Sequence, residues 1–313
     1  MNILFSLHLY PPHHMCGAEM VAHTVMRFLK SKGHRVRALH HRSPEWYEYE
    51  GVEVMPKSRN IMDQMRWADV IFTHLDFAKW TIHMGRMLNI PTVFFVHNTS
   101  DWYDDILKMH PGTKVVYNSH AAKEMLQYNN PSCVLHPPCD WRHYEVDNTG
   151  ADAVTLINLD HNKGGHILRQ IAEAMPKQKF IGVKGSYSAD DNGQFTDQPP
   201  NVEVLPLQSD IREVYKRTRV LIMPSEYESW GRTMTEAMCS GIPVISTPTF
   251  GLKENAGDAG IFIEDRDDIK AWVKAIRSLS NAERYKVARE AARKRSRELD
   301  PIGELEAFYS FLF

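Results

Sequence analysis

The order of strand-like and helix-like segments constrains the fold of this chain more than any single motif. Short apolar runs alternate with amphipathic helical runs, and the alternation starts again after a stretch of Pro, Gly and polar residues at 136–153. Strands and helices that alternate with short turns favour parallel sheets with crossover helices. The pattern therefore predicts an α/β protein with two facing Rossmann-like domains and a cleft between them. The expected strands are residues 2–9, 35–41, 52–56, 69–75, 92–98, 114–119, 133–138, 153–159, 179–185, 201–207, 219–225, 242–248 and 260–264.

The boundary between the two domains is predicted near residue 145. A chain of 313 residues with 43% hydrophobic residues is long enough to bury two cores. The N-terminal domain would comprise residues 1–145 and the C-terminal domain residues 146–299. Residues 300–313 carry apolar side chains that would otherwise be exposed, so we expect them to form a helix that completes the first domain.

Composition predicts a globular protein of the cytoplasm. The formal net charge of -2 argues against a surface adapted throughout to nucleic acid. The four cysteines form no Cys-x-x-Cys pair, which is typical of reduced thiols. The first residues, MNILFSLHLYPP, lack the basic leader and cleavage site of a signal peptide and are interpreted as a strand. No run reaches the roughly 20 apolar residues of a membrane span.

Six loops are expected at the carboxyl ends of the predicted strands. Ligands of open parallel sheets bind at this edge, so these loops are the candidate binding segments. They are residues 8–19, 96–102, 158–165, 182–188, 224–231 and 247–255.

Lys163, Gly164 and Gly165 stand between an expected strand and an expected helix. Free backbone N–H groups, the helix dipole and the lysine charge together favour an anion, and phosphate fits best. A solvated lysine beside a glycine-assisted turn explains the same residues. This segment by itself leaves both interpretations open.

A second loop and helix start have the sequence PSEYESWGRTMTEAM, residues 224–238. Gly231 would let a ligand approach the first-turn N–H groups of the helix. A carboxylate at Glu236 can accept two hydrogen bonds from adjacent hydroxyls, as on a ribose, and Glu228 could reach a second ring across the phosphates. These features favour a nucleotide-sugar, and the alternative is two surface glutamates on an ordinary helix and its leading loop.

Taken together, these segments resemble the retaining glycosyltransferases of the GT-B group, specifically family four, the glycogen synthase and phosphatidylinositol mannosyltransferase-like group. The resemblance covers about residues 153–264 and includes a glutamate pair eight positions apart (236 − 228 = 8). Two positions depart from the family pattern, because Cys16 replaces a glycine and Asn158 stands where the family has arginine. The matching residues are Pro224, Ser225, Glu228, Gly231, Glu236, Ala237, Gly241, Ile242, Pro243, Val244, Gly251 and Glu254, together with Gly17, Ala18, Glu19, His97, Lys163 and Gly164.

The resemblance implies an enzyme that moves a sugar from a nucleotide-diphosphate donor to an acceptor with retention of anomeric configuration. It also implies that the second domain binds the donor and the first domain the acceptor. The residues implied in catalysis are His97, Lys163 and Glu228. The residues implied in donor binding are Gly17, Asn158, Lys163, Gly164, Gly185, Glu228, Ser229, Trp230, Gly231, Arg232, Glu236, Gly251, Leu252, Lys253 and Glu254. The residues implied in acceptor binding are His13, His14, His97 and Asn98.

The residue types suit this reaction. Cleavage of the bond between the sugar C1 and the diphosphate leaves a sugar of oxocarbenium character and puts negative charge on the leaving oxygen, which fixed donors and Lys163 would stabilise. The scheme needs neither a metal nor a cofactor, and the donor would be a UDP-, GDP- or ADP-sugar. The acceptor is left open among a lipid, a glycan, a small molecule and a modified nucleic-acid base.

Two other functions compete with this interpretation. A dinucleotide oxidoreductase would need Gly-x-Gly-x-x-Gly after a first strand, and neither residues 7–17 nor residues 158–165 supply it. A protein that binds a nucleotide-sugar without turnover is compatible with the departures at Cys16 and Asn158. Release of nucleoside diphosphate would separate a catalyst from such a binder.

Three clusters have a structural as well as a functional interpretation. The adjacent histidines at 13–14 and 40–41 have no acidic or cysteine partner at ligand spacing, so no metal site is expected. The basic helix at 283–299 is expected to be solvated, with peripheral contact to a membrane as the alternative. The aromatic residues within 98–105 would either stack on a sugar or base or pack beneath their loop.

Overall fold

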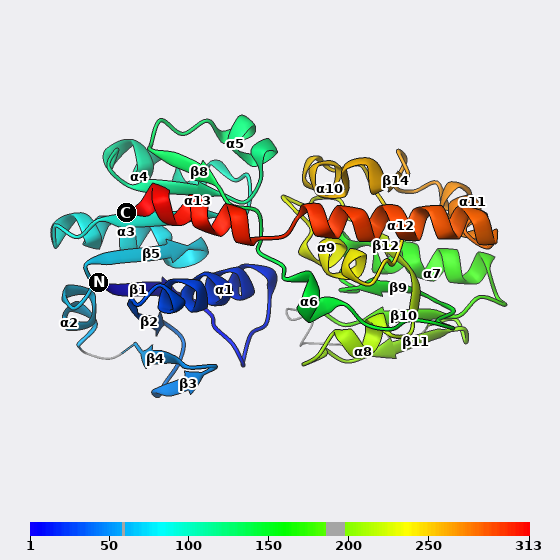
Figure 1. The fold of residues 1–313 in the computed structure, drawn as a ribbon, viewed down its shortest axis with the longest axis horizontal. Helices are drawn as coiled ribbons and strands as arrows, with labels where there is room; N and C mark the ends of the chain where they lie inside the picture. The colour runs from blue at the N-terminus through cyan, green and yellow to red at the C-terminus, as the bar shows by residue number, and fades with distance from the viewer. Residues whose placement is uncertain (58–59, 186–197) are drawn as a thin grey trace. The chain divides into compact units, whose positions relative to one another are not determined.

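The structure is a computed structural model that describes residues 1–57, 60–185 and 198–313. The chain divides into two compact units (Figure 1). Unit 1 comprises Met1–Pro138 with Pro301–Phe313, and unit 2 comprises Cys139–Asp300. The division follows Pro138 rather than residue 145, because the segment that contains Tyr144 packs into the core of unit 2.

Unit 1 is built on an eight-stranded sheet in the order β3-β4-β2-β1-β5-β6-β7-β8. Neighbouring strands pair in parallel except β3, a short edge strand antiparallel to β4 that the sequence pattern missed. The strands are β1 (Asn2–Leu7), β2 (Arg35–His40), β3 (Tyr47–Tyr49), β4 (Val52–Pro56), β5 (Val70–His74), β6 (Thr92–Val96), β7 (Lys114–Tyr117) and β8 (Ser132–Val134). The α-helices described in this unit are α1 (Gly17–Ser31), α2 (Ile61–Arg66), α3 (Ala78–Met87), α4 (Asp104–Met109), α5 (His120–Leu126) and α13 (Ile302–Leu312).

Both faces of the central strand β1 are buried, as its continuous apolar sequence requires. Ile3 and Phe5 pack in the core cluster that includes residues of α1 and α13, whereas Leu4 packs in a second cluster with Met65 of α2. The last helix, α13, lies against the strands of unit 1 (Figure 1). It completes the first of these clusters, because the ring of Phe308 lies 5.9 Å from that of Phe95. The C-terminal segment is therefore a helix of unit 1.

Unit 2 contains a six-stranded parallel sheet in the order β11-β10-β9-β12-β13-β14. Its strands are β9 (Ala153–Ile157), β10 (Phe180–Val183), β11 (Val202–Leu205), β12 (Thr218–Met223), β13 (Val244–Ser246) and β14 (Ile261–Phe262). Its described α-helices are α6 (Trp141–Tyr144), α7 (Gly165–Ala174), α8 (Arg212–Tyr215), α9 (Arg232–Cys239), α10 (Phe250–Ala256), α11 (Ile269–Ser278) and α12 (Ala282–Glu298). The predicted α/β fold with parallel sheets is thus confirmed.

The strand order of unit 2 reverses between β9 and β12. The chain runs outward from β9 to β11 on one side of the sheet and from β12 to β14 on the other. Open α/β sheets bind ligands at such a switch point, beyond the carboxyl ends of the strands. The loops after β9 and β12 are therefore the expected ligand-binding segments of unit 2.

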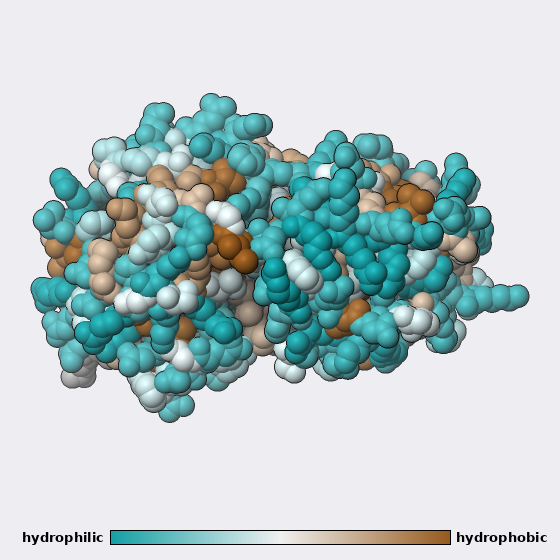
Figure 2. Space-filling model, viewed as in Figure 1, coloured by the Kyte–Doolittle hydropathy of each residue, from teal (hydrophilic) through white to brown (hydrophobic). Residues whose placement is uncertain are grey.

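The surface of unit 2 around α12 is hydrophilic (Figure 2). Lys294 lies 3.8 Å and Arg295 lies 3.2 Å from the carboxylate of Glu298, and Arg297 pairs with Glu145 at 3.0 Å. These ion pairs agree with the solvated-helix interpretation of the basic segment. None of the helices that the structure describes has the length and apolar character needed to span a bilayer.

Candidate functional site

Two helices of unit 2 begin at glycines in the left-handed backbone region. Gly164 has φ +94° before α7, and Gly231 has φ +81° before α9. A Cβ at Gly164 would lie 2.4 Å from Cγ of Pro224, and one at Gly231 would lie 2.4 Å from Cδ2 of Leu252. Glycine is needed at both positions for conformation, and at Gly164 also for space, because a Cβ there would lie 2.8 Å from the carbonyl oxygen of Pro224. Both helix starts present backbone N–H groups at the carboxyl edge of the sheet.

Lys163 and Glu228 meet at this edge. Nζ of Lys163 lies 2.6 Å from Oε1 of Glu228, and the side chains are 26% and 15% exposed. Lys163 ends a short 3-10 turn after β9, and Glu228 lies in the loop after β12. The hydroxyl of Ser225 donates to the same carboxylate oxygen at 3.0 Å. The two predicted catalytic residues of unit 2 are thus in direct contact across 65 positions of sequence.

Arg266 connects the loops that carry these two residues, and the sequence analysis missed it. Its guanidinium donates to the carbonyl oxygen of Pro224 at 2.6 Å and to that of His161 at 2.8 Å. A backbone hydrogen bond from Glu226 to the carbonyl of Asn162, 2.9 Å long, joins the same loops. Arg266 therefore fixes the backbone on both sides of the Lys163–Glu228 pair. The one sequence signal for Arg266 is its position shortly after the strand expected at residues 260–264.

The loop from Glu228 to Gly231 is held against α10. The N–H of Gly251 donates to the carbonyl of Glu228 at 3.2 Å, and a Cβ at Gly251 would lie 2.2 Å from the carbonyl carbon of Ser229. Asn255 donates to the carbonyls of Trp230 and Gly231 at 3.0 and 3.1 Å. These contacts bring together most of the predicted donor residues, and they add Asn255, which the sequence analysis did not select.

The remaining predicted donor residues of α10 differ in burial. Leu252 is fully buried, Glu254 is half-buried and Lys253 is exposed. Lys253 is therefore the one of these three with a freely accessible cationic side chain.

Glu236 lies on α9 in a nearly buried polar network. Its Oε2 accepts a hydrogen bond from the hydroxyl of Tyr215 at 3.0 Å, and its Oε1 lies 3.3 Å from Nε of Arg232. Arg232 also donates to the hydroxyl of Tyr144 at 2.7 Å. Burial raises the pKa of both tyrosines, so both hydroxyls keep their protons at neutral pH. The guanidinium of Arg232 is thus engaged with Glu236 and Tyr144.

Asn158 has a local structural role. It adopts φ +74° after β9, and its amide oxygen accepts the backbone N–H of Asp160 at 2.9 Å. A Cβ at Gly185, which follows β10, would lie 2.4 Å from this oxygen. The two predicted donor residues Asn158 and Gly185 therefore lie side by side, and the asparagine side chain supports the turn that precedes Lys163.

The predicted residues of unit 1 lie in loops at the carboxyl edge of its sheet. His97 follows β6, and its Nε2 lies 3.1 Å from Nδ1 of His74 at the end of β5. Burial, with a smaller contribution from His8, lowers the pKa of His97 to about 4, and burial also holds the pKa of His74 well below its usual value. Both rings are neutral at pH 7. His74 was not selected from the sequence.

The other predicted residues of unit 1 are more exposed. His13 is exposed, with its ring 5.4 Å from that of Tyr47, and His14 is half-buried. The side-chain oxygen of Asn98 accepts the N–H of Ser100 at 3.3 Å. Gly17 is the exposed first residue of α1.

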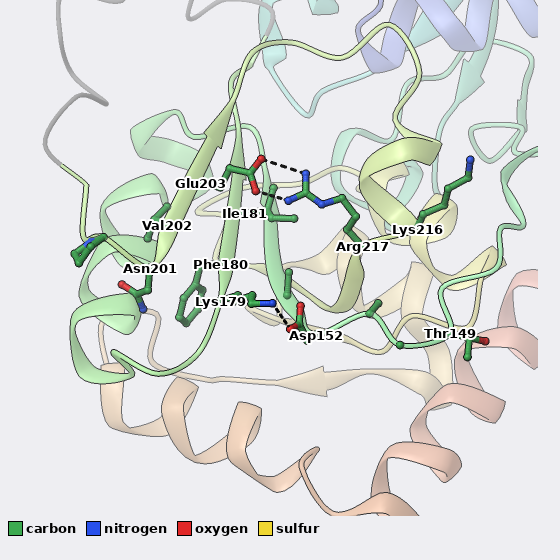
Figure 3. Close-up of a pocket in the computed structure, with 14 residues that line it drawn as sticks. Thr149, Asp152, Lys179, Phe180, Ile181, Asn201, Val202, Glu203, Lys216 and Arg217 are labelled. Atoms are coloured by element: carbon green, nitrogen blue, oxygen red, sulfur yellow. Dashed lines mark hydrogen bonds and ion pairs between the residues drawn. The ribbon is translucent and has the colours of Figure 1, made fainter.

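A shallow depression of about 470 Å³ lies at the opposite, amino edge of the unit 2 sheet (Figure 3). The charged residues along it are paired: Lys179 with Asp152 at 2.6 Å, Arg217 with Glu203, and Lys216 with Glu213 of α8 at 2.6 Å. None of the catalytic, donor-binding or acceptor-binding residues predicted from the sequence lines this depression. Each of these charges has an ion-pair partner within unit 2, so we assign no function to the depression.

Comparison with solved structures defines the fold class. The structure of Anabaena Alr3699/HepE in complex with UDP-glucose has a TM-score of 0.82 and 17% identity, and the match covers 100% of this chain and 99% of that one. Sucrose-phosphate synthase from Thermosynechococcus elongatus has a TM-score of 0.79 and 14% identity, covering 99% and 97%. At these identities the likeness shows the fold, which is that of the GT-B glycosyltransferases.

The family-model match lies within unit 2. Residues 152–295 match the family model described as Glycosyl transferases group 1. Sulfoquinovosyl transferase SQD2 of Arabidopsis thaliana is 30% identical over 147 residues, which are 44% of this chain and 28% of that relative. The family model thus covers the segment that contains the Lys163–Glu228 pair. This chain spans less than a third of the length of the Arabidopsis relative.

Proposed function

We propose that this protein is a glycosyltransferase that moves a sugar from a nucleotide-diphosphate donor to an acceptor. The observation that carries the proposal is the Lys163–Glu228 pair, 2.6 Å apart, at the switch point of a parallel sheet. A cation and a carboxylate there, beside the helix starts at Gly164 and Gly231, suit a ligand that has both a diphosphate and hydroxyl groups. The group 1 match over residues 152–295 supports the same function.

In this proposal unit 2 binds the donor. The backbone N–H groups at the starts of α7 and α9 and the ammonium of Lys163 bind the diphosphate. Glu228 accepts hydrogen bonds from sugar hydroxyls. Glu236 accepts them from the ribose, because a carboxylate has about four lone-pair positions and Tyr215 and Arg232 engage only part of them.

The transfer step breaks the bond between C1 of the sugar and the diphosphate oxygen and forms a bond from C1 to the acceptor oxygen. Lys163 stabilises the charge that develops on the leaving oxygen. The acceptor proton passes to the leaving phosphate on the same face, so the anomeric configuration is retained. The reaction requires no metal in this scheme, and turnover is expected to persist in a chelator.

Unit 1 is proposed to bind the acceptor through His13, His14, His97 and Asn98. Neutral His97 can accept a hydrogen bond from, or donate one to, an uncharged hydroxyl. The acceptor class is a lipid, a glycan, a small molecule or a modified nucleic-acid base. A cytoplasmic location with peripheral membrane contact is part of the same proposal.

Calorimetric binding of UDP-, GDP- and ADP-sugars tests the donor assignment. A UDP-sugar is the first choice, because the Anabaena neighbour was solved with UDP-glucose. The matched variants are Lys163→Ala and Lys179→Ala, since Lys179 also pairs with a carboxylate at 2.6 Å but lies at the amino edge. Binding of one donor class that weakens only in Lys163→Ala supports the proposal. No binding of any nucleotide-sugar, or equal affinity in both variants, contradicts it.

A further inference from the structure

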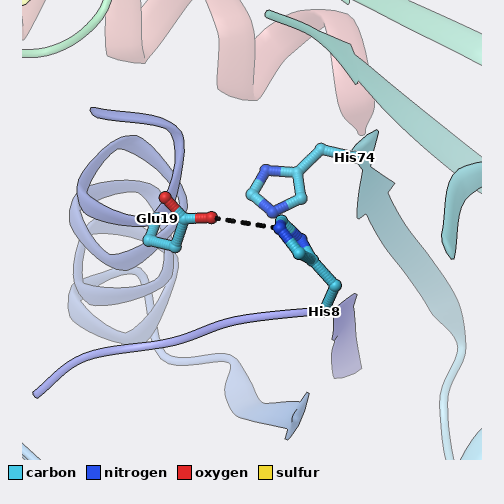
Figure 4. Close-up of side chains that lie close together, drawn as sticks. All are labelled: His8, Glu19 and His74. Carbon is cyan, nitrogen blue, oxygen red and sulfur yellow. Dashed lines mark ion pairs between the residues drawn. The ribbon is translucent and has the colours of Figure 1, made fainter. Parts of the chain in front are cut away.

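A buried cluster in unit 1 contains two imidazoles and one carboxylate from three different elements. His8 follows β1, Glu19 lies in the first turn of α1, and His74 ends β5 (Figure 4). The three residues are 4%, 1% and 1% exposed. One ligand atom from each lies within 4.8 Å of the other two. The side chains therefore converge on one small volume at the carboxyl edge of the sheet.

The polar atoms of this cluster are poorly satisfied by the protein. Nε2 of His8 and Oε1 of Glu19 are 3.8 Å apart, too far for a hydrogen bond. Within the described residues, Nδ1 of His8, Nε2 of His74 and both carboxylate oxygens of Glu19 lack a hydrogen bond of good geometry. The Glu19 carboxylate has only looser interactions, with the side chain of Cys16 and with its own backbone N–H. Buried polar groups almost always have partners, so this concentration of unpaired atoms calls for one.

We infer that His8, Glu19 and His74 form a binding site for a divalent transition-metal ion of the zinc class. Two imidazole nitrogens and one carboxylate oxygen are the ligand set of a three-residue zinc site, whereas magnesium and calcium prefer oxygen ligands. Around a tetrahedral ion with bonds of about 2.1 Å the ligand atoms would stand about 3.4 Å apart. Small side-chain rotations from the observed separations would reach this geometry.

The surroundings also suit a metal ligand at His74. Nδ1 of His74 faces Nε2 of His97 at 3.1 Å, which leaves Nε2 of His74 directed toward Glu19 and His8. A metal-bound histidine usually directs its other ring nitrogen to a hydrogen-bond acceptor, and His97 fills that role.

This inference concerns unit 1 alone and does not depend on the proposed transferase activity. The pairs His13–His14 and His40–His41, which stand out in the sequence, are not its ligands. The ion would neutralise the Glu19 carboxylate and tie the start of α1 to β1 and β5, so its expected effect is to raise the thermal stability of unit 1.

The test is titration of the chelator-washed full chain with Zn²⁺ by calorimetry and with Co²⁺ by visible absorption. We expect one ion per chain and the intense visible bands of tetrahedral Co²⁺. Weak octahedral bands, or no binding, would overturn the inference. The cobalt spectrum is recorded on the unaltered protein, so this result remains informative even if a variant fails to fold.

Substitutions then locate the ion. Glu19→Gln and His8→Gln should weaken Zn²⁺ affinity by more than the roughly 10- to 100-fold expected for loss of the outer partner in His97→Gln. The matched control is Glu50→Gln, because Glu50 contacts His23 at 3.2 Å in the same unit but belongs to no three-ligand cluster that the described residues form. Equal affinity of Glu19→Gln and Glu50→Gln would show that the ion binds surface histidines instead.

Discussion

Glu228→Gln is expected to tighten the binding of a nucleoside diphosphate while it slows sugar transfer. In the structure, Nζ of Lys163 lies 2.6 Å from the Glu228 carboxylate. If Lys163 binds the donor diphosphate, this pair must be broken or shared when the nucleotide enters. The carboxylate also repels the incoming phosphates. Its neutralisation therefore removes a cost of nucleotide binding, although it removes a contact to the sugar as well.

The size of the effect follows from the pair that is lost. A charge-assisted hydrogen bond contributes about 1.5–3 kcal/mol, and partial exposure of the two side chains reduces this to about 1–2 kcal/mol here. The dissociation constant of UDP, or of the diphosphate that binds, should fall by about 5- to 30-fold. The sugar-bearing donor should gain less, because it loses the Glu228 contact.

Calorimetry with the nucleoside diphosphate measures this directly. Glu203→Gln is the matched control, because Glu203 pairs with Arg217 at the amino edge and should leave affinity unchanged. In a Lys163→Ala background most of the gain from Glu228→Gln should disappear, since no lysine remains to be released. Unchanged or weaker diphosphate affinity in Glu228→Gln would refute the exchange of Lys163 between carboxylate and phosphate.

Three further predictions use other residues. Lys163→Ala should lower kcat about 100- to 1000-fold, which is about 3–4 kcal/mol in the barrier, because the alternative cation Arg232 is paired with Glu236. A loss of less than about threefold would show that the phosphate does not bind at Lys163. Glu236→Ala should weaken diphosphate binding by about 1.5–3 kcal/mol in calorimetry, and unchanged affinity would remove it from the site. Unit 1 should lose stability as pH falls from 6.5 to about 4, because burial lowers the pKa of His41 to about 4. The folded state then binds fewer protons than the unfolded state, at a cost on the order of 3 kcal/mol. Amide exchange should show a smaller acid loss in His41→Gln.

The α/β architecture could be predicted because it depends on local patterns. The period of the hydrophobic residues and the turn residues identify each strand and helix. The alternation of strands with helices implies that the strands pair in parallel. The edge strand β3 was missed because its three residues, Tyr47–Tyr49, are too few to establish an alternating pattern. The boundary was predicted near residue 145, whereas the units divide after Pro138. The polar segment around Tyr144 has the composition of a linker but packs into the core of unit 2.

The candidate site could be predicted only in part. The glycine turns and the glutamate pair have sequence signatures, so Gly164, Gly231 and Glu228 were selected. The Arg266 contacts and the His8, Glu19 and His74 cluster depend on side chains distant in sequence, which no local pattern reveals. The roles assigned to the site residues stay predictions.

The most direct test of the proposed function is release of nucleoside diphosphate. UDP-, GDP- and ADP-sugars would each be incubated with pools of lipid, glycan, small-molecule and modified-nucleoside acceptors, and both diphosphate and sugar-bearing product would be measured. We predict release from one donor class with equimolar product, retained in Lys179→Ala and nearly lost in Lys163→Ala. Nucleotide-sugar binding without release in any pool, or equal release by both variants, would contradict the proposal that this chain is a glycosyltransferase.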